Sequence, residues 1–266
     1  MTDSRLDAAL AERGLARSRS HAATLIAAGL VSVDGRPVLK ASAKVRVDQE
    51  LTVAGADHYV SRGAHKLIAA LDAFAIPVAG RIALDAGAST GGFSQVLLER
   101  GAARVIAVDV GHGQLSPILA PEPALTVVEG FNVRDMTQES LAGASGIDDR
   151  PDLVVADLSF ISLPLVLPAL VATAADGADF VLLIKPQFEV GKSGIREGIV
   201  RDPGRRADAV ANVLWAAFDL GVGTAGLTPS PIAGGAGNHE YLVWMSATKG
   251  SNPTEWLDLI TSMTGA

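Results

Sequence analysis

Hydrophobic and polar residues follow two different patterns along this chain. In the first quarter, apolar positions recur at helical spacing and then at every second position, whereas later wholly apolar runs are separated by longer stretches of helical spacing. Such runs are typical of buried strands, and helical stretches between them are typical of βα units. The pattern predicts a small α+β domain followed by a larger α/β domain with a mostly parallel sheet.

The N-terminal segment, residues 1–58, is predicted to form two short helices and then a small sheet. Leu6 and Leu10 lie on one face of the first helix, and Gly14 ends it. The run V-S-V-D-G-R-P-V then predicts a hairpin with its turn at residues 34–35. A solvated surface or a binding surface explains the polar side of the helices equally well; it presents Arg5, Arg13, Arg17, Arg19 and His21.

Residues 59–62 are predicted to link this segment to a second domain spanning residues 63–266, which opens with a helix over residues 63–74. Further helices are expected at 163–174 and 205–220, with a short one closing the chain. The predicted strands are 82–85, 104–110, 125–129, 152–157, 180–188 and a last strand that begins beside Glu240.

A glycine-rich stretch follows the first of these strands, with the sequence I-A-L-D-A-G-A-S-T-G-G-F at residues 82–93. Gly87, Gly91 and Gly92 lack a Cβ atom, so the backbone can turn tightly and a ligand can approach it closely. The next strand ends in Asp109, whose carboxylate can bind two ribose hydroxyls. A nucleoside cofactor is therefore favoured over a purely structural turn.

The spacing of these glycines departs from the G-x-G-x-x-G dinucleotide fingerprint. It resembles the D-x-G-x-x-x-G-x-F signature of S-adenosylmethionine-dependent methyltransferases with a Rossmann-like sheet, which implies S-adenosyl-L-methionine as the cofactor. Ligands of open α/β sheets bind beyond the carboxyl ends of the strands, so Asn132 is a candidate for the adenosine pocket. The expected cofactor-binding residues are Asp85, Gly87, Ser89, Thr90, Gly91, Gly92, Phe93, Asp109, Asn132 and Asp157.

The N-terminal motifs carry a second resemblance. The run R-L-D-x-x-L-x-x-R-G-L-A-x-S-R, followed by L-I-x-x-G-x-V-x-V-D-G, closely resembles the small RNA-binding domain named after ribosomal protein S4. The resemblance implies a surface that reads the shape and phosphates of RNA rather than base edges. Its expected RNA contacts are Arg5, Arg17, Arg19 and Lys40, with Arg62 in the linker and Lys192 and Arg196 in a basic, glycine-rich loop after the fifth strand as further candidates.

Four charged residues come from four separate predicted elements: Lys66, Asp157, Lys185 and Glu240. In this order they resemble the tetrad of FtsJ-type ribose 2'-O-methyltransferases. Together with S-R-G-A-H-K at residues 61–66 and the S4-like segment, they identify the chain as a member of the TlyA family, historically labelled hemolysins. The resemblance implies methylation of cytidine in ribosomal RNA of the small subunit and, in some members, also of the large subunit.

A ribose hydroxyl is a poor nucleophile, so such a site must accept its proton and stabilise the developing alkoxide. We expect Lys185 to be the base, while Lys66 favours its neutral form and helps to hold the alkoxide. Asp157 and Glu240 are expected to orient the two amines, with Asp157 also near the methylsulfonium. No metal is required.

The charge distribution agrees with a basic, RNA-binding N-terminal segment followed by an acidic remainder. The net charge is -7, yet residues 1–66 hold 10 Lys/Arg against 7 Asp/Glu, which leaves 12 against 22 for the remainder. The absence of cysteine excludes disulfides and thiolate zinc sites. Without a signal peptide or an apolar run of about 18 residues, a soluble cytoplasmic protein is expected.

The sequence argues against three other functions. A non-catalytic RNA-binding protein should have lost part of the glycine loop or tetrad, and an S4-fused pseudouridine synthase needs a different fold without a cofactor loop. A membrane-active hemolysin should show a spanning segment or a long basic amphipathic helix. The target nucleotide, the choice of ribosomal subunit and the oligomeric state stay open at this stage.

Overall fold

The computed structural model describes residues 4–16, 18–53, 58–191, 195, 197–234 and 237–266. The chain divides into two compact units, Met1–His58 and Tyr59–Ala266, which are described separately. The four residues predicted as a linker, 59–62, group with the larger unit.

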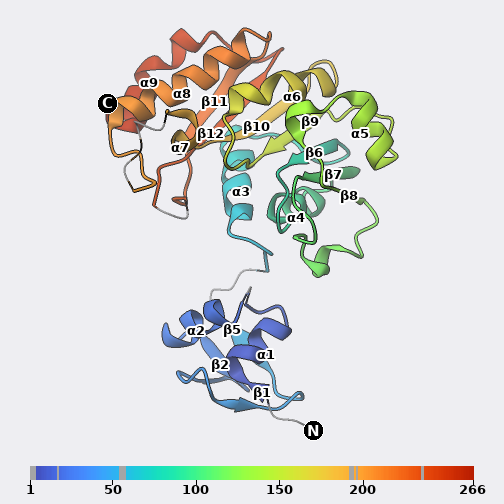
Figure 1. Ribbon diagram of the computed structural model, residues 1–266, viewed down its shortest axis with the longest axis vertical. Helices are drawn as coiled ribbons and strands as arrows, with labels where there is room; N and C mark the ends of the chain where they lie inside the picture. The colour runs from blue at the N-terminus through green and yellow to red at the C-terminus, as the bar shows by residue number, and fades with distance from the viewer. Residues whose placement is uncertain (1–3, 17, 54–57, 192–194, 196, 235–236) are drawn as a thin grey trace. The chain divides into compact units, whose positions relative to one another are not determined.

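The N-terminal unit packs two helices against short antiparallel strands (Figure 1). Leu6, Leu10 and Ile26 from the helices are fully buried together with Val31 of the sheet. The turn between β2 and β3 has left-handed backbone at Asp34 (φ 48°) and Gly35 (φ 74°), as a two-residue hairpin of type I′ demands. The elements are β1 (Ser4–Arg5), α1 (Leu6–Glu12), α2 (Arg19–Ala27), β2 (Val31–Val33), β3 (Arg36–Pro37), β4 (Lys44–Val45) and β5 (Leu51–Val53).

The larger unit is built on a seven-stranded sheet with the order β11-β12-β10-β9-β6-β7-β8. From β8 to β10 neighbouring strands are parallel, and β12 is antiparallel to both β10 and β11. The predicted α/β class with a mostly parallel sheet is confirmed. The strands are β6 (Ile82–Ala86), β7 (Arg104–Asp109), β8 (Leu125–Glu129), β9 (Leu153–Ala156), β10 (Asp179–Ile184), β11 (Gly223–Pro229) and β12 (Tyr241–Ser246).

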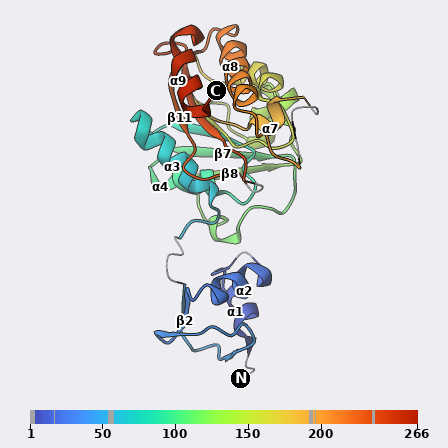
Figure 2. The same cartoon turned by 90° about the vertical axis from the view of Figure 1, so that its left-hand side faces the viewer.

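Helices cover both faces of this sheet (Figures 1 and 2). Ala83 and Val155 face the core formed with α3 and α4, whereas Leu84 and Val154 face the core formed with α5, α6, α8 and α9. Alternate residues of each strand are therefore apolar on both sides, which explains the unbroken apolar runs in the sequence. The helices are α3 (Gly63–Phe74), α4 (Gly92–Glu99), α5 (Gln138–Ser145), α6 (Leu167–Thr173), α7 (Pro186–Glu189), α8 (Pro203–Phe218) and α9 (Leu257–Thr264).

Two strands differ from the prediction, and helix α5 was not predicted. The run 180–188 contains a strand that ends at Ile184 and then the short helix α7, because Pro186 at its first position favours helical backbone. Strand β11 was not predicted, since its glycines suggest a loop. A Cβ at Gly223 would lie 2.7 Å from the carbonyl carbon of Gly250, and one at Gly226 would lie 2.6 Å from the Phe74 ring.

The direction of β12 decides which residues meet at the edge of the sheet. Tyr241, its first residue, pairs with Ile184, the last residue of β10. Because the strands run in opposite directions, the start of β12 lies at the edge where the parallel strands end. Glu240 and Lys185, which flank this pair, therefore reach the same edge as Asp157 after β9.

Candidate active site

The structure brings the four predicted tetrad residues together in one row. Glu240 Oε2 lies 2.6 Å from Lys66 Nζ, and Lys66 Nζ lies 3.8 Å from Asp157 Oδ2. On its other side Asp157 Oδ1 lies 2.6 Å from Lys185 Nζ. Carboxylates and amines thus alternate in the order Glu240, Lys66, Asp157 and Lys185.

Burial makes this alternation necessary. The side chains of Glu240, Lys185 and Lys66 are only 3%, 9% and 10% exposed, whereas that of Asp157 is 21% exposed. A buried charge is costly unless an opposite charge or hydrogen bonds compensate it, and here each lysine has a carboxylate within 2.6 Å. Asp157, which contacts both amines, is the member most open to solvent.

Lys185 also has two neighbours that the sequence did not single out. Its Nζ donates a hydrogen bond to Ser159 Oγ at 2.9 Å and lies 5.9 Å from the centre of the Phe188 ring. The ion pair with Asp157 is closer, but the good hydrogen-bond geometry is at the serine. The sequence could have indicated Ser159 through its position two residues after Asp157, the carboxylate that follows strand β9.

A tight loop holds Glu240 in place. A Cβ added to Gly234 would lie 2.5 Å from Glu240 Oε1, so the carboxylate occupies space that only glycine leaves free. The Gly234 amide donates to the carbonyl of Asn238, whose side chain in turn accepts from Val200 N and donates to Gly198 O. Gly234 therefore allows close packing around Glu240.

The glycine loop lies directly beside the tetrad. Gly87 and Gly91 have φ of 85° and 93°, a conformation that favours glycine, and Ser89 is also left-handed. A Cβ at Gly87 would lie 3.2 Å from the carbonyl oxygen of Asp157. The sequence predicted that a ligand could approach Gly87 closely. In the structure the main chain of Asp157, just after β9, makes this close approach.

Asp109 faces the glycine loop from the end of β7. Its Oδ2 accepts a hydrogen bond from Ser89 N at 2.8 Å, and its Oδ1 accepts one from Gly111 N at 2.7 Å. Gln114 Nε2 lies 3.5 Å from the same carboxylate. An ionised carboxylate has about four acceptor positions, so the two backbone donors fix its orientation and leave room for ribose hydroxyls.

Asp85 and Phe93 are placed differently from the direct contacts expected. Asp85 is fully buried, accepts a hydrogen bond from Ser94 Oγ at 2.7 Å, and has no partner for Oδ1 among the described residues. Its burial raises the pKa of Asp85 to about 7. Phe93 packs in the core between α3 and α4. Both side chains therefore support the loop from inside and do not line its open face.

Asn132 also has a local role. Its side chain accepts from Arg134 N at 3.1 Å and contacts Asp135 at 3.2 Å, which caps the short 3-10 turn Val133–Asp135. The residue is exposed just beyond β8, at the functional edge of the sheet. Thr90 and Gly92 belong to the same loop and helix start as Gly91, and a Cβ at Gly92 would collide with Ser61 Oγ.

The residues before α3 pack on the helix that follows the glycine loop. Val60 N donates to Gln95 Oε1 at 2.9 Å, and the Ser61 hydroxyl lies against Gly92. Arg62 is exposed at the start of α3, one turn before Lys66. Residues of the predicted linker therefore contact α4, the helix that follows the glycine loop, through both backbone and side-chain atoms.

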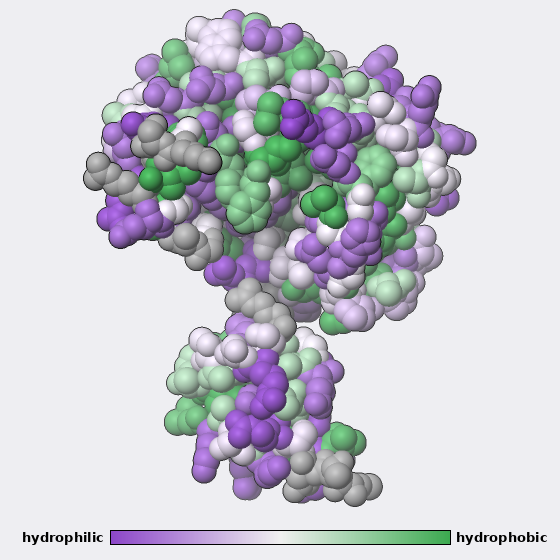
Figure 3. Space-filling view, in the orientation of Figure 1, coloured by the Kyte–Doolittle hydropathy of each residue, from purple (hydrophilic) through white to green (hydrophobic). Residues whose placement is uncertain are grey.

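In the N-terminal unit, two of the predicted RNA contacts converge on one carboxylate. Arg5 makes a two-point contact with Asp7, with both distances 3.0 Å, and Arg19 Nη2 lies 3.4 Å from Asp7 Oδ2. The hydrogen bond from Arg5 is the main cause that lowers the pKa of Asp7 to about 2. Lys40 is exposed, and strongly hydrophilic side chains gather on the visible face of this unit (Figure 3). Arg17, Lys192 and Arg196 lie outside the described residues.

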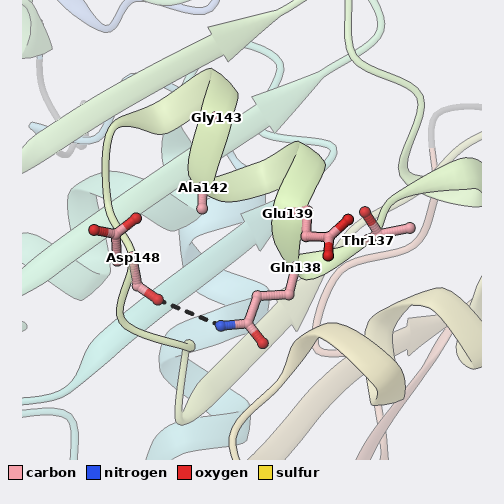
Figure 4. A pocket seen from close by; sticks show the side chains of 6 residues that line it. All are labelled: Thr137, Gln138, Glu139, Ala142, Gly143 and Asp148. Carbon is pink, nitrogen blue, oxygen red and sulfur yellow. Dashed lines mark hydrogen bonds between the residues drawn. The ribbon is translucent and has the colours of Figure 1, made fainter.

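A surface hollow elsewhere in the larger unit contains none of the predicted site residues. It lies at the start of α5, where Gln138 donates to the carbonyl of Asp148 (Figure 4). Its lining consists of Thr137, Gln138, Glu139, Ala142, Gly143 and Asp148. In the described part of the chain, no helix is both long and apolar enough to cross a membrane, and no three His, Asp or Glu side chains form a group able to hold a metal.

Comparisons with known proteins support both resemblances. A model of FtsJ-like methyltransferases matches residues 59–247, and a model of the S4 domain matches residues 4–51. The 16S/23S rRNA (cytidine-2'-O)-methyltransferase TlyA of Mycobacterium tuberculosis is 53% identical over 244 residues, which are 91% of this chain and 89% of that protein. Hemolysin A of Brachyspira hyodysenteriae is 38% identical and covers 90% of this chain and 98% of its own length.

Among solved structures, a hemolysin candidate from Streptococcus thermophilus superposes with a TM-score of 0.76 and 36% identity. The match covers 100% of this chain and 97% of that chain. The two resemblances predicted from the motifs are confirmed, and the pseudouridine synthase alternative, which requires a different fold, is not supported.

Proposed function

The chain belongs to the TlyA family of FtsJ-like methyltransferases, and we propose that it methylates the 2'-hydroxyl of a cytidine ribose in ribosomal RNA, with S-adenosyl-L-methionine as methyl donor. The observation that carries this proposal is the buried row of Lys66, Asp157, Lys185 and Glu240 beside a glycine loop. The Mycobacterium tuberculosis relative is named for both 16S and 23S rRNA, so the small subunit is the first acceptor to test and the large subunit the second.

The residues around the glycine loop fit this cofactor. Asp109 offers an oriented carboxylate to a ribose, and the left-handed backbone at Gly87 and Gly91 shapes the loop beside it. Asp157, whose main chain lies beside Gly87, is proposed to lie near the sulfonium of the bound cofactor. The bound cofactor supplies a methyl group already activated by positive sulfur, so the protein has to position and deprotonate the acceptor.

Lys185 is the proposed base. Its amine takes the 2'-hydroxyl proton as the oxygen–methyl bond forms and the sulfur–methyl bond breaks, which leaves a 2'-O-methyl ribose, a protonated lysine and S-adenosylhomocysteine. Lys66 contacts the other oxygen of the same carboxylate, Asp157. It supplies the second positive charge that stabilises the developing alkoxide. Since both amines are buried, water screens this effect less than at the surface.

The two carboxylates have different proposed roles. Glu240 contacts Lys66 and is almost fully buried, which suits a residue that holds the amine and compensates its charge. Asp157 contacts both lysines and is partly open, which suits a residue that fixes the distance between base and second cation. Arg5 and Arg19 are proposed to hold the RNA by its phosphates.

The direct test is transfer of labelled methyl from S-adenosylmethionine to purified 30S and 50S subunits, with the modified position mapped by mass spectrometry. The Lys185→Ala variant should lose about 10³-fold in rate while it still binds the cofactor in calorimetry. Lys249→Ala is the matched control, because Lys249 is a surface lysine beside Trp244 and should retain full activity. No cofactor binding by the wild type, with or without RNA, would refute the enzyme proposal.

A further inference from the structure

Ser159 is an exposed residue beside the proposed base. Lys185 is buried, but Ser159 is exposed, and its Oγ accepts the hydrogen bond from Lys185 Nζ at 2.9 Å. The serine follows Asp157 by two residues, so one short loop supplies both polar neighbours of the amine. The tetrad mechanism gives Ser159 no role.

The loop that carries Ser159 is fastened to the helix that follows Lys185. Glu189 in α7 accepts hydrogen bonds from Ser162 Oγ at 2.6 Å and Leu163 N at 2.9 Å. Phe160 has left-handed backbone with φ 65° and is 92% exposed. For a bulky residue this conformation is unfavourable, and it persists only where surrounding contacts maintain it. The loop therefore holds Ser159 beside Lys185 at some conformational cost.

The stereochemistry of the amine shows what this position can do. A neutral lysine amine has two N–H donors and one lone pair, in three tetrahedral directions around Nζ. Ser159 Oγ at 2.9 Å accepts one of these N–H groups, whereas Asp157 Oδ1 at 2.6 Å is an ion-pair contact without hydrogen-bond geometry. The serine therefore fixes one direction around Nζ, which limits the directions in which the lone pair can face the ribose hydroxyl.

We propose that Ser159 is a positioning residue for the methyl transfer: its hydroxyl takes one N–H direction of Lys185, beside the ion pair with Asp157, and so restricts how the lone pair of the amine can face the substrate. This inference rests on the proposed function, with Lys185 as the base. Without Ser159 the amine can rotate about its Cε–Nζ bond, and the lone pair points away from the hydroxyl for part of the time. Poor orientation of a reacting group lowers the rate of the chemical step without weakening binding.

The charges around Lys185 predict a specific pH signature. The charged groups that face it are Asp157 directly, Lys66 through Asp157, Glu240 through Lys66, and Glu189 on its own helix. Ser159 is uncharged, so its removal leaves this charge pattern intact. The loss of rate should therefore be the same at every pH tested, because the charges around the amine are unchanged.

The experiment compares Ser159→Ala and Ser159→Thr with wild type in single-turnover methylation of ribosomal subunits from about pH 6 to about pH 10. We expect Ser159→Ala to be about 10-fold slower at every pH, with unchanged KM for subunits and unchanged cofactor affinity. Ser159→Thr should recover to within about twofold of wild type, because it keeps the hydroxyl at an exposed position.

Ser162→Ala is the loop control. It removes the hydroxyl bound to Glu189 and leaves Ser159 in the chain. The inference is overturned if Ser159→Ala stays within twofold of wild type, if its loss disappears at high pH, or if threonine and alanine are equally slow. It is also overturned if Ser162→Ala reproduces the whole pattern, since Ser159 would then only pack the loop. An inactive wild type, or an active Lys185→Ala variant, would contradict the proposed function instead.

Discussion

The two units each hold a cluster of alternating charges, but the burial of the charges is reversed. In the N-terminal unit the carboxylate of Asp7 is 9% exposed, while Arg5 and Arg19 around it are 45% and 61% exposed. In the larger unit Lys66 and Lys185 are buried together with Glu240. A buried carboxylate that organises exposed guanidinium groups leaves positive charge at the surface, whereas buried amines paired with carboxylates form a charged site that is shielded from water.

The largest expected effect comes from Lys66→Met, which removes one amine from the buried cluster. Glu240 would remain buried without its partner, so the free energy of unfolding should fall by about 3 kcal/mol. The single-turnover rate should fall by about 10³-fold through loss of the second cation. Urea unfolding and methylation assays measure the two effects. Arg19→Met, the matched change in the exposed cluster, should alter stability by less than about 0.5 kcal/mol.

The next effect tests the geometry of the buried cluster without changing its charge. Gly234→Ala places a methyl group 2.5 Å from Glu240 Oε1, so the carboxylate must shift and its contact with Lys66 is disturbed. We expect about a 10-fold to 100-fold loss of methylation rate, with cofactor affinity retained. Gly143→Ala, where an added methyl meets no atom within 4 Å, is the control. Equal activity of the two variants would show that the position of Glu240 is unimportant.

The exposed cluster should respond in binding and not in chemistry. Arg5→Ala or Arg19→Ala should weaken subunit binding by several-fold and reduce the salt dependence of affinity by about one phosphate contact each. The single-turnover rate at saturating subunits should stay at the wild-type value. Filter binding at several salt concentrations gives both quantities, with Arg46→Ala as a control of equal charge in the same unit. A fall in the saturated rate would contradict this division of roles.

The smallest expected effect concerns pH and stability, with opposite signs in the two units. Asp85 has a folded-state pKa raised to about 7 by burial, so its contribution to stability is present at low pH and is lost as pH rises toward 7. Asp7 has a pKa lowered to about 2, so its contribution is constant above about pH 5 and is lost only in acid.

Tryptophan fluorescence can follow the larger unit alone, since all three tryptophans of the chain, Trp215, Trp244 and Trp256, lie in it. Its unfolding temperature should fall by a few degrees between about pH 5 and about pH 8, and Asp85→Asn should remove that slope. The same slope in both proteins would show that Asp85 ionises as freely in the folded state as in the unfolded chain.

Most of the sheet was predictable from local pattern, and the resemblance to FtsJ-type methyltransferases then identified the tetrad. Asp109, Asp157 and Lys185 each follow an apolar run, and in a parallel sheet all such ends meet at one edge. The helix Gly63–Phe74 and the strand Leu125–Glu129 were predicted with the bounds that the structure has, because their apolar spacing is regular.

What could not be predicted depends on contacts between distant segments. Ser159 acquires its partner through a loop fixed by Glu189, and the convergence of Arg5 and Arg19 on Asp7 depends on how β1 and α2 pack. Asp85 and Phe93 carry the expected motif, yet their side chains point inward. A motif specifies residue types and spacing, whereas the direction of each side chain is decided by packing.

We expect methylation activity to depend on the pairing of Tyr241 with Ile184, because this register sets the position of Glu240 at the start of β12. If β12 slipped by one residue, every side chain of that strand would turn to the opposite face, and Glu240 would no longer reach Lys66. Such a misregistered molecule could keep its strands and most of its hydrogen bonds and still be inactive. Activity per folded molecule therefore measures the fidelity of one strand alignment, a quantity that spectroscopic measures of folding do not detect.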